Sequence, residues 1–393
     1  MPKSLIESAL SGPPSGPNRS TPSQSANESE IERIAKSLDI CIKVVGCGGA
    51  GSNTIDRCTE SGLTSADTCA MNTDAKHLLG IRAGKKILLG KLLTRGLGAG
   101  AKPEVGEKAA LENEADISSY LRGAQIVFVT AGMGGGTGTS SSAVVSRLAK
   151  AIGALTIGVV TLPFKSEGEV RLENAMAGVS KLAKICDTTI VIPNDTLLEL
   201  VPGLPVRAAF KVADELLVQT ISGLTDMLTS AGLVNVDFAD LRTILNEGGV
   251  SLIGVGESPS VGTERIEEAV EEALQSPLLG KMDLRGGRGA LIRIVGGPDM
   301  TIEEAAAAAG KVTDRIRHDG RLIWGCSIEP DMGGRVKVLL IVTGAQSKYV
   351  LVRDGEDAAM MPTCEDYKGV INVPSDLHDD EDFSKFVRST TPP

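Results

Sequence analysis

Two glycine-rich segments contain the residues whose spacing points most directly to chemistry. They are GCGGAGSN at 46–53 and GMGGGTGTS at 132–140, and each lies between an apolar run and a helix-like segment. Glycine has no Cβ, so a ligand can approach the backbone closely and consecutive N–H groups can point at one anion. The free N–H groups at the start of a following helix add to this preference for phosphate. The pattern therefore predicts two phosphate-binding loops.

The first segment alone leaves three interpretations open. Its G-x-G-x-x-G spacing, from Gly46 to Gly51, also fits a nicotinamide-dependent dehydrogenase, with Asp74 after the second strand as the ribose ligand. A tight turn that holds no ligand is a third, less favoured interpretation. The second segment contains no lysine, so it is not a G-x-x-x-x-G-K-[ST] loop, and a single-loop dinucleotide fold does not need it. Two such loops on adjacent strands predict a bound di- or triphosphate.

The elements that would position these loops alternate between strands and helices. We expect helices at 52–62, 104–122, 140–153 and 167–186, and strands at 40–46, 68–72, 85–90, 124–132, 154–164 and 188–194. Continuous apolar runs in the strands are typical of strands that are buried on both faces. The order predicts an α/β fold with a Rossmann-like parallel sheet that is covered by helices on both faces.

A long apolar-periodic helix and a smaller α+β domain are expected to follow. The latter has strands at 290–297 and 336–344, and a helix at 301–316 that opens with a Thr301-x-x-Glu304 capping box. The predicted organisation is a disordered tail at 1–28, a nucleotide-binding domain at 29–205, a central helix at 206–232, an α+β domain at 233–345 and a flexible tail at 346–393.

Composition excludes several classes of protein. A hydrophobic share of 42% among 393 residues rules out a chain that is disordered throughout. The net charge of −10 argues against a general nucleic-acid binder, so phosphate would have to be held by backbone N–H groups, helix ends and a metal ion. Seven cysteines without a C-x-x-C pair favour a reducing compartment over disulfides or zinc. We find no signal peptide and no apolar run of ~20 residues, and therefore expect a cytoplasmic protein without direct membrane insertion.

Several motifs in a fixed order give the chain a family resemblance. Besides the two glycine segments they are NTD at 72–74, RGLGAGAKPEVG at 95–106, PFKSEG at 163–168, IPND at 192–195, NVDFADLRT at 235–243 and SPLL at 276–279. Over residues 40–345 the sequence resembles the FtsZ family of tubulin-like cell-division GTPases, and its loops resemble archaeal members more than eukaryotic tubulin. Ser140 departs from the pattern, because many relatives have another glycine there.

The resemblance implies a GTP/GDP site, with Mg²⁺ or K⁺ near the phosphates and no side-chain metal ligands assigned. The first loop would cradle phosphate, Ala99 and Gly100 would line the γ-phosphate side, Glu167 would bind the ribose and Arg171 would approach the phosphates. The implied nucleotide-binding residues are Gly48, Gly49, Ala50, Gly51, Asn53, Asn72, Asp74, Ala99, Gly100, Gly132, Gly134, Gly135, Gly136, Thr137, Gly138, Thr139, Glu167, Arg171, Asn194, Phe210 and Asp214.

Phe210 and Asp214 are four residues apart and therefore share one face of the long helix. In the implied site Phe210 stacks on guanine, and Asp214 accepts from guanine N1–H and the exocyclic amine. An adenine base would leave that acceptor unpaired, at a cost of ~1–3 kcal/mol. Taken alone, Phe210 would be a core residue and Asp214 a solvated one.

Asp237 and Asp240 are the predicted catalytic residues. By itself Asp237 fits a helix N-cap. The resemblance implies that both carboxylates face the nucleotide of the next subunit in a head-to-tail filament and position the attacking water. It also implies a Z-ring protein at the mid-cell division site, whose C-terminal tail binds membrane-anchoring or regulatory proteins. His77, His318 and His378 show no ligand spacing, and we interpret them as incidental.

Two other functions stay open at this point. A dinucleotide-dependent oxidoreductase would use Gly46 to Gly51, but the chain offers no candidate acid for hydride transfer and the GGGTGT motif would be unexplained. A nucleotide-binding scaffold of the same superfamily without turnover would not need Asp237 and Asp240. Nucleotide preference separates a GTPase from the oxidoreductase, and turnover separates it from the scaffold.

Overall fold

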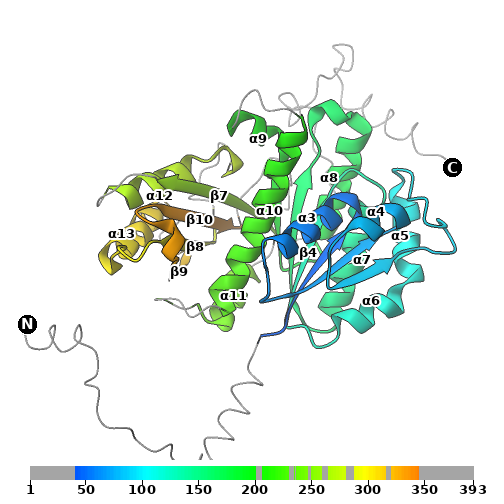
Figure 1. Cartoon of the computed structure of the whole chain (residues 1–393), viewed down its shortest axis with the longest axis horizontal. Coiled ribbons are helices and arrows are strands. Elements are labelled where there is room, and N and C mark those ends of the chain that lie inside the picture. Colours follow the sequence, from blue (N-terminus) through cyan, green and yellow to red (C-terminus); the bar gives the residue numbers. More distant parts are fainter. Residues whose placement is uncertain are drawn as a thin grey trace, which may run out of the picture. The chain divides into compact units, whose positions relative to one another are not determined.

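A computed structural model describes residues 40–200, 206–229, 234, 236–246, 249–258, 264–279, 287–315 and 320–344 (Figure 1). The predicted tails at 1–28 and 346–393 lie outside the described residues, as does the end of the helix expected at 301–316. The domain boundaries given above stay predictions.

The first six strands form a parallel sheet, as the apolar runs predicted. They are β1 (Ile42–Cys47), β2 (Asp67–Asn72), β3 (Lys85–Leu88), β4 (Ile126–Gly132), β5 (Leu155–Leu162) and β6 (Thr188–Pro193). Each pairs in parallel with its neighbour in the order β3-β2-β1-β4-β5-β6. The order reverses direction at β1 and β4, and open α/β sheets bind ligands at such a switch point, beyond the carboxyl ends of the strands.

Helices and short turns connect these strands. They are α3 (Gly48–Glu60), α4 (Ala75–Gly80), α5 (Pro103–Glu112), α6 (Glu114–Leu121), α7 (Thr137–Ala151), η1 (Lys165–Glu167), α8 (Glu169–Ala183), α9 (Asn194–Leu200) and α10 (Val206–Thr229). The helix expected at 104–122 is two helices, because Asn113 leaves helical geometry and its side-chain Oδ1 accepts from the N–H of Gly90 at 2.9 Å.

Apolar side chains cover the sheet on both faces. On one face Val45, Val129 and Val160 belong to a core cluster with Val144 of α7 and Val179 of α8. On the other face the cluster contains Phe128, Ile157 and Ile192 together with Ile55 of α3 and with Leu217, Ile221 and Leu224 of α10. The predicted fold class, an α/β parallel sheet with helices on both faces, is confirmed.

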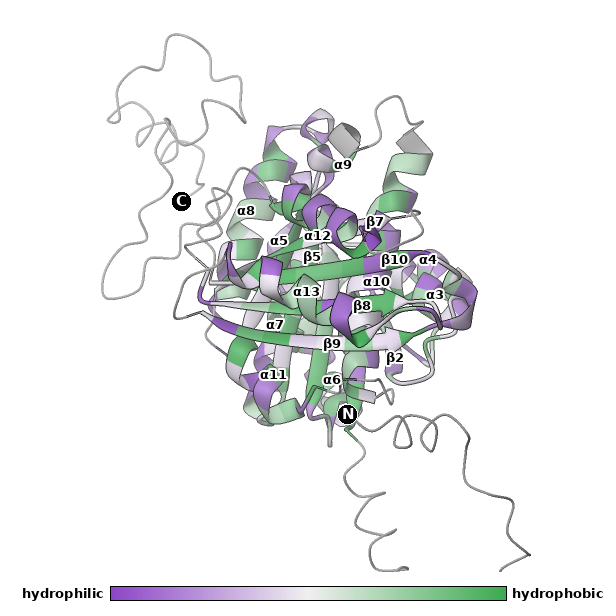
Figure 2. Ribbon diagram, turned by 90° about the vertical axis from the view of Figure 1, so that its left-hand side faces the viewer, coloured by the Kyte–Doolittle hydropathy of each residue, from purple (hydrophilic) through white to green (hydrophobic). Residues whose placement is uncertain are grey.

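The second half of the chain continues the sheet with a mixed pattern. Strands β7 (Val250–Ser258), β10 (Val336–Thr343), β8 (Gly289–Gly296) and β9 (Arg321–Ile328) extend it in that order; β10 is antiparallel to β7 and β8, and β9 is parallel to β8. The helices are α11 (Phe238–Leu245), α12 (Arg265–Gln275) and α13 (Ile302–Thr313), with short turns η2 (Pro277–Leu279) and η4 (Pro330–Met332). Figure 2 shows purple, hydrophilic residues on α12 and α13 and mainly green, hydrophobic ones along β10.

Strand β7 and helix α12 are missing from the expected elements, and two glycines explain why. Gly254 and Gly256 interrupt the apolar pattern of β7 and suggest a turn. In the structure a Cβ at these positions would lie 2.2 Å from the carbonyl oxygen of Ala273 and 2.0 Å from that of Ala269. Helix α12 therefore packs directly on the strand backbone, and glycine is required in the strand for that contact.

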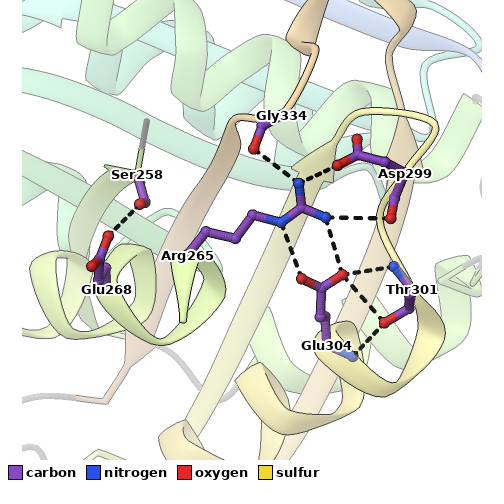
Figure 3. Close-up of polar contacts among 7 residues, drawn as sticks. All are labelled: Ser258, Arg265, Glu268, Asp299, Thr301, Glu304 and Gly334. Atoms are coloured by element: carbon purple, nitrogen blue, oxygen red, sulfur yellow. Dashed lines mark hydrogen bonds and ion pairs between the residues drawn. The ribbon is translucent and has the colours of Figure 1, made fainter. Parts of the chain in front are cut away.

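A buried arginine connects α12, α13 and the loop before β10 (Figure 3). The side chain of Arg265 is 3% exposed and donates to both carboxylate oxygens of Glu304, at 3.0 and 3.1 Å, and to the carbonyl of Gly334 at 2.9 Å. It also pairs with Asp299. Glu304 closes the predicted capping box by accepting from the N–H of Thr301 at 2.8 Å, which confirms that box.

Replacing Arg265 with Met should destabilise the second half of the chain by about 3–5 kcal/mol, because Glu304 would stay buried without its cation. Urea unfolding followed by the fluorescence of Trp324, the single tryptophan, which lies on β9, measures this effect. The control is Arg335→Met, which removes an ion pair to Glu257 whose side chains are 51% and 39% exposed and should cost under ~1 kcal/mol. Equal losses in the two variants would contradict the proposed role of the buried network.

Candidate functional site

Two helix N-termini meet at the carboxyl ends of the neighbouring strands β1 and β4. Strand β1 ends at Cys47 and α3 begins at the next residue, Gly48, while α7 begins at Thr137 after the glycine run. Neither N-cap residue, Cys47 or Gly136, makes a side-chain capping hydrogen bond. First-turn N–H groups at both helix ends are therefore available to an anion.

The two loops pack against each other so closely that side chains are excluded. A Cβ at Gly48, whose φ is +73°, would lie 2.6 Å from the backbone N of Gly138, and a Cβ at Gly132 would lie 2.6 Å from the Cβ of Ala50. Gly49 and Gly135, in contrast, have nothing within 4 Å of the position a Cβ would take. The open sides of these two glycines mark the space where a ligand could meet both loops.

The predicted γ-phosphate segment lies beside the second loop. A Cβ at Gly136 would be 2.9 Å from the Cβ of Ala99 and 2.8 Å from the N of Lys102. Gly100 has a φ of +60° and nothing within 4 Å, so its backbone is open. Ala101, with a φ of 59°, is one of two non-glycine residues in the left-handed region among those described. Such strain is typical of loops whose shape is functionally constrained.

Ser140, the departure from the family pattern, lies in the first turns of α7. Its hydroxyl donates to the carbonyl of Gly136 at 2.8 Å. The side chain is thus satisfied inside the helix. It leaves the open side of Gly135 unobstructed, because nothing lies within 4 Å of that position.

Three of the predicted phosphate-side residues are joined by a histidine that we had interpreted as incidental. His77 Nε2 lies 3.0 Å from Asn53 Oδ1, and His77 Nδ1 lies 3.2 Å from Asn72 Nδ2. The backbone N–H of His77 donates to Asp74 Oδ1 at 3.0 Å, so Asp74 caps α4. The interpretation of His77 as incidental is wrong for this part of the fold, and the capping spacing Asp74-x-x-His77 is the signal that could have placed it.

The hydrogen bonds around His77 match one tautomer of the neutral ring. Asn72 Oδ1 accepts from the N–H of Thr73 at 2.8 Å, so the Asn72 amide turns its N–H₂ toward Nδ1 of the ring. That nitrogen must accept, which leaves the proton on Nε2 to be donated to Asn53. One ring in one tautomer therefore orients two asparagines.

Glu167 and Arg171 lie at the second loop but bind each other. Their side chains form an ion pair one turn apart, and Glu167 Oε1 also accepts from the N–H of Phe164 at 3.0 Å. A Cβ at Gly134 would lie 2.6 Å from the carbonyl of Arg171, so the start of α8 touches the loop. Their separate contacts with ribose and phosphate stay predictions.

The residues predicted for the base occupy one region at the start of α10. Phe210 is 42% exposed and packs edge-on against Phe164, with ring centroids 5.1 Å apart, so it is not simply a core residue. Asp214 pairs with Arg57 of α3 at 3.2 Å. Burial raises the pKa of Asp214 to about 6, and Arg57 partly opposes this rise. Asn194 is 4% exposed and its Oδ1 has no hydrogen-bond partner among the described residues, as expected for a group that awaits a ligand.

Asp237 and Asp240 lie elsewhere in the chain. Both are exposed at the start of α11, where Asp237 is the N-cap and accepts from the N–H of Ala239 at 3.3 Å. In Figure 1, α11 lies at the far end of α10 from α9. The helical rise from Asp214 to the end of α10 is on the order of 20 Å. The structure therefore does not bring these acids to the glycine loops of their own chain.

The residues fit a metal that arrives with the phosphates better than a protein-built metal site. The described part of the chain contains no group of three or more His, Cys, Asp or Glu side chains that could hold an ion. Mg²⁺ commonly takes one or two carboxylates, several waters and substrate phosphates. Asp74, with one oxygen used for capping, is the carboxylate among the predicted phosphate-side residues.

Comparison with known proteins identifies both halves of the chain. Residues 41–202 match the Tubulin/FtsZ family GTPase domain, and residues 249–346 match the FtsZ family C-terminal domain. A cell division protein FtsZ from Haloferax mediterranei is 48% identical over 341 residues, 87% of this chain and 90% of its own length. An FtsZ 1 from Pyrococcus abyssi is 50% identical over 331 residues, 84% of this chain and 88% of its own.

Solved structures show the same relationship. An empty FtsZ dimer from M. jannaschii matches with a TM-score of 0.78 and 46% identity, covering 86% of this chain and 99% of that one. CetZ1 from Haloferax volcanii, at 22% identity and a TM-score of 0.69, covers 78% of this chain and 95% of its own and shares the fold alone.

Gly135→Ala should weaken nucleotide binding by about tenfold or more, equivalent to ~1.4 kcal/mol, without loss of stability. The added methyl would project into space that is open in the fold, where nothing lies within 4 Å. Isothermal titration with GTP, beside a thermal melt, measures both effects. Gly310→Ala in α13 is the matched control, because it too has nothing within 4 Å. Unchanged GTP affinity in Gly135→Ala would place the ligand elsewhere.

His77→Ala should weaken GTP binding by roughly five- to tenfold, since one lost hydrogen bond is worth ~1 kcal/mol and two asparagines lose their orientation. His77→Gln keeps a donor that can reach Asn53 and should recover part of the loss. The same titrations measure both variants. If His77→Ala binds GTP as the natural chain does, the ring contributes packing only.

Proposed function

The chain belongs to the FtsZ family of tubulin-like cell-division GTPases, and we propose that it assembles head-to-tail into filaments whose hydrolytic sites are shared between subunits. GTP binding and GTPase activity follow from the family. Beyond the family, the proposal concerns which residues hold the nucleotide, which residues act on it, and why neither set suffices within one chain.

The separation of the two predicted sets of residues is the observation that carries the proposal. The glycine loops open at one end of α10 and the exposed Asp237 and Asp240 follow its other end. Carboxylates on the order of 20 Å away cannot position water at a phosphate in the same chain. A second subunit stacked in the same orientation would bring its Asp237 and Asp240 to the nucleotide of the first subunit. Repeating this head-to-tail contact gives an open filament rather than a closed ring.

Exposed apolar side chains beside the loops support a protein contact there. Leu97, which pairs through its backbone with Asp74, is 86% exposed, and Val170, next to Arg171, is 70% exposed. Exposed apolar residues of this kind are often found at interaction surfaces. The M. jannaschii relative, whose structure is described as a dimer, supports the same proposal of self-association.

In the proposed site each group has one task. N–H groups of the two loops bind the phosphates, Phe210 stacks on the base, Asp214 accepts from guanine, and Asn194 uses its free Oδ1 for the sugar or base. Mg²⁺, or K⁺, neutralises phosphate charge when it is bound with GTP. Asp237 and Asp240 of the adjoining subunit orient the water for in-line attack on the γ-phosphate, giving GDP and phosphate. A scaffold without turnover would leave these two acids without a role.

Attachment to the membrane would be indirect under this proposal. The described residues contain no helix that is long and apolar enough to cross a bilayer. The acidic and then apolar sequence DDEDFSKFV at 379–387 could bind a membrane-anchoring or regulatory division protein and so hold filaments at mid-cell. That assignment rests on the family resemblance and the sequence.

Turnover per molecule should depend on protein concentration. GTP hydrolysis and light scattering, recorded together, should both stay near zero below a threshold and rise together above it. Asp240→Ala should keep GTP affinity and filament formation but lose about 100-fold or more in turnover, the scale of a lost catalytic base. A specific activity that is constant at every concentration would mean a self-contained site and would refute the role of Asp237 and Asp240.

GTP affinity should fall as pH drops through about 6, because Asp214 has its pKa raised to about 6 by burial and must be ionised to accept from guanine. At one pH unit below that value the ionised fraction is about tenfold smaller. GTP affinity is measured from pH 8 to 5 in the natural chain and in Asp214→Asn. The GTP phosphates titrate in the same way in both experiments, so dividing one affinity profile by the other leaves only the effect of Asp214. Parallel profiles would exclude Asp214 from base recognition.

A further inference from the structure

A cavity lies along the edge strand β3 and the beginnings of the strands beside it. It has a volume of about 630 Å³ and is lined by residues at the starts of β1, β2 and β3, by the length of β3, and by α6. We call it the lysine groove, after Lys43, Lys85, Lys86 and Lys91, which line it together with Asp67 and Asp116. Four cations and two carboxylates give this surface a positive balance in a chain whose net charge is −10.

No lysine of the groove forms an ion pair with a carboxylate in the described part of the chain. Lys43 donates to the carbonyl of Tyr120 and stands 4.8 Å from the centre of its ring, and Lys86 donates to the carbonyl of Leu79 at 3.0 Å. Lys85 is exposed at the start of the edge strand β3, and Lys91 is exposed three residues after the end of that strand. The groove therefore presents positive charge that its own walls do not neutralise.

The sequence supplies a segment of opposite charge. Residues 346–393 contain ten acidic and five basic side chains, which is half of the net charge of the whole chain. Five of the acids fall within residues 376–382: Asp376, Asp379, Asp380, Glu381 and Asp382. Phe383 follows directly and could meet the partly exposed Tyr120.

The topology places the start of that segment on the same side of the sheet as the groove. Strand β7 is parallel to β6, and β10 is antiparallel to β7. The chain therefore leaves the end of β10, at Gly344, at the edge where β1 to β6 begin. The groove opens at the beginnings of β1, β2 and β3 on that edge.

The length of chain matches the span. Seven strand intervals separate β10 from β3 in the sheet order, which at ~4.8 Å each is roughly 34 Å. If the 34 residues between Gly344 and Asp379 form the flexible tail that the sequence predicts, random-coil scaling gives an end-to-end distance of about 29–35 Å. A tether whose length matches the span gives a millimolar effective concentration, so a weak ionic contact suffices for substantial occupancy.

We propose that the lysine groove binds the acidic segment 376–382 of the same chain. The contact would hold the adjoining DFSKFV sequence against the body of the subunit and away from other partners. The residues that line the groove include none of the predicted nucleotide-binding residues, so the contact does not require an occupied GTPase site. It should weaken with salt, since the Debye length falls from ~10 Å at 0.1 M to ~3 Å at 1 M.

Zero-length cross-linking of the full chain with carbodiimide, mapped by mass spectrometry, tests the proposal. Amide bonds should form between Lys85 or Lys91 and residues 379–382 at 0.05 M salt and be lost at 1 M. A mixture of ¹⁴N and ¹⁵N chains, kept dilute and without GTP, should give cross-links within one isotopic species. Mixed species would mean that the tail of a second copy occupies the groove and would overturn the proposal.

Charge reversal provides the decisive comparison. The pair Lys85→Glu and Lys91→Glu should reduce the cross-links between the tail and Lys86, an exposed groove lysine that keeps its amine, about fivefold or more. This is the change expected when a tenfold loss of affinity acts on a half-occupied site. Adding Asp379→Lys, Asp380→Lys, Glu381→Lys and Asp382→Lys should restore cross-links between the tail and the groove, now between the introduced tail amines and the introduced groove carboxylates. The control pair Lys108→Glu and Lys184→Glu changes exposed lysines outside the groove and should leave the natural cross-links intact. The proposal is wrong if reversing the charges of both groove and tail restores no cross-links, or if the natural chain forms no tail cross-links at all. The lysines would then serve only to keep the edge strand soluble.

Discussion

The close approach of the two glycine loops is the constraint on which the rest of the arrangement depends. A Cβ at Gly48 would lie 2.6 Å from the backbone of Gly138, so only glycine lets the N-termini of α3 and α7 come together at the ends of β1 and β4. That meeting leaves uncapped N–H groups facing one space. An acidic chain can bind a polyanion there because backbone dipoles, rather than lysines, provide the attraction.

Under the proposed function, the central helix makes this local site depend on assembly. Helix α10 would offer Phe210 and Asp214 to the base near its start, and the chain reaches Asp237 and Asp240 only after its end. Its rigid length fixes the distance between nucleotide and acids within one subunit and, by the same geometry, the repeat that would bring the acids of the next subunit into place. The proposal thus assigns binding and hydrolysis to two different faces of one molecule.

Much of this could be predicted from residues, and the exceptions have physical causes. The apolar runs of β1, β4 and β5 predicted the parallel sheet because such strands are buried on both faces. The starts of α3 and α7 were expected several residues too late, because glycines that read as loop form the first helical turns. Strand β7 was not predicted because its glycines, Gly254 and Gly256, suggest a turn, whereas in the structure they allow helix α12 to pack on the strand backbone. The spacing from Asp74 could have placed the backbone of His77, but the contact of its ring with Asn53, which is distant in sequence, could not be predicted from spacing.

Mixing two inactive variants tests the shared site most directly. One is Asp240→Ala, with its glycine loops intact; the other carries Gly49→Ala and Gly135→Ala, with its acids intact. Each alone should hydrolyse almost no GTP. Co-sedimentation verifies that filaments of an equimolar mixture contain both variants. In such filaments roughly a quarter of the subunit contacts would join intact glycine loops to an intact Asp240 of the next subunit. About a quarter of the natural turnover should therefore return. Filaments that contain both variants and still hydrolyse no GTP would contradict a site divided between subunits.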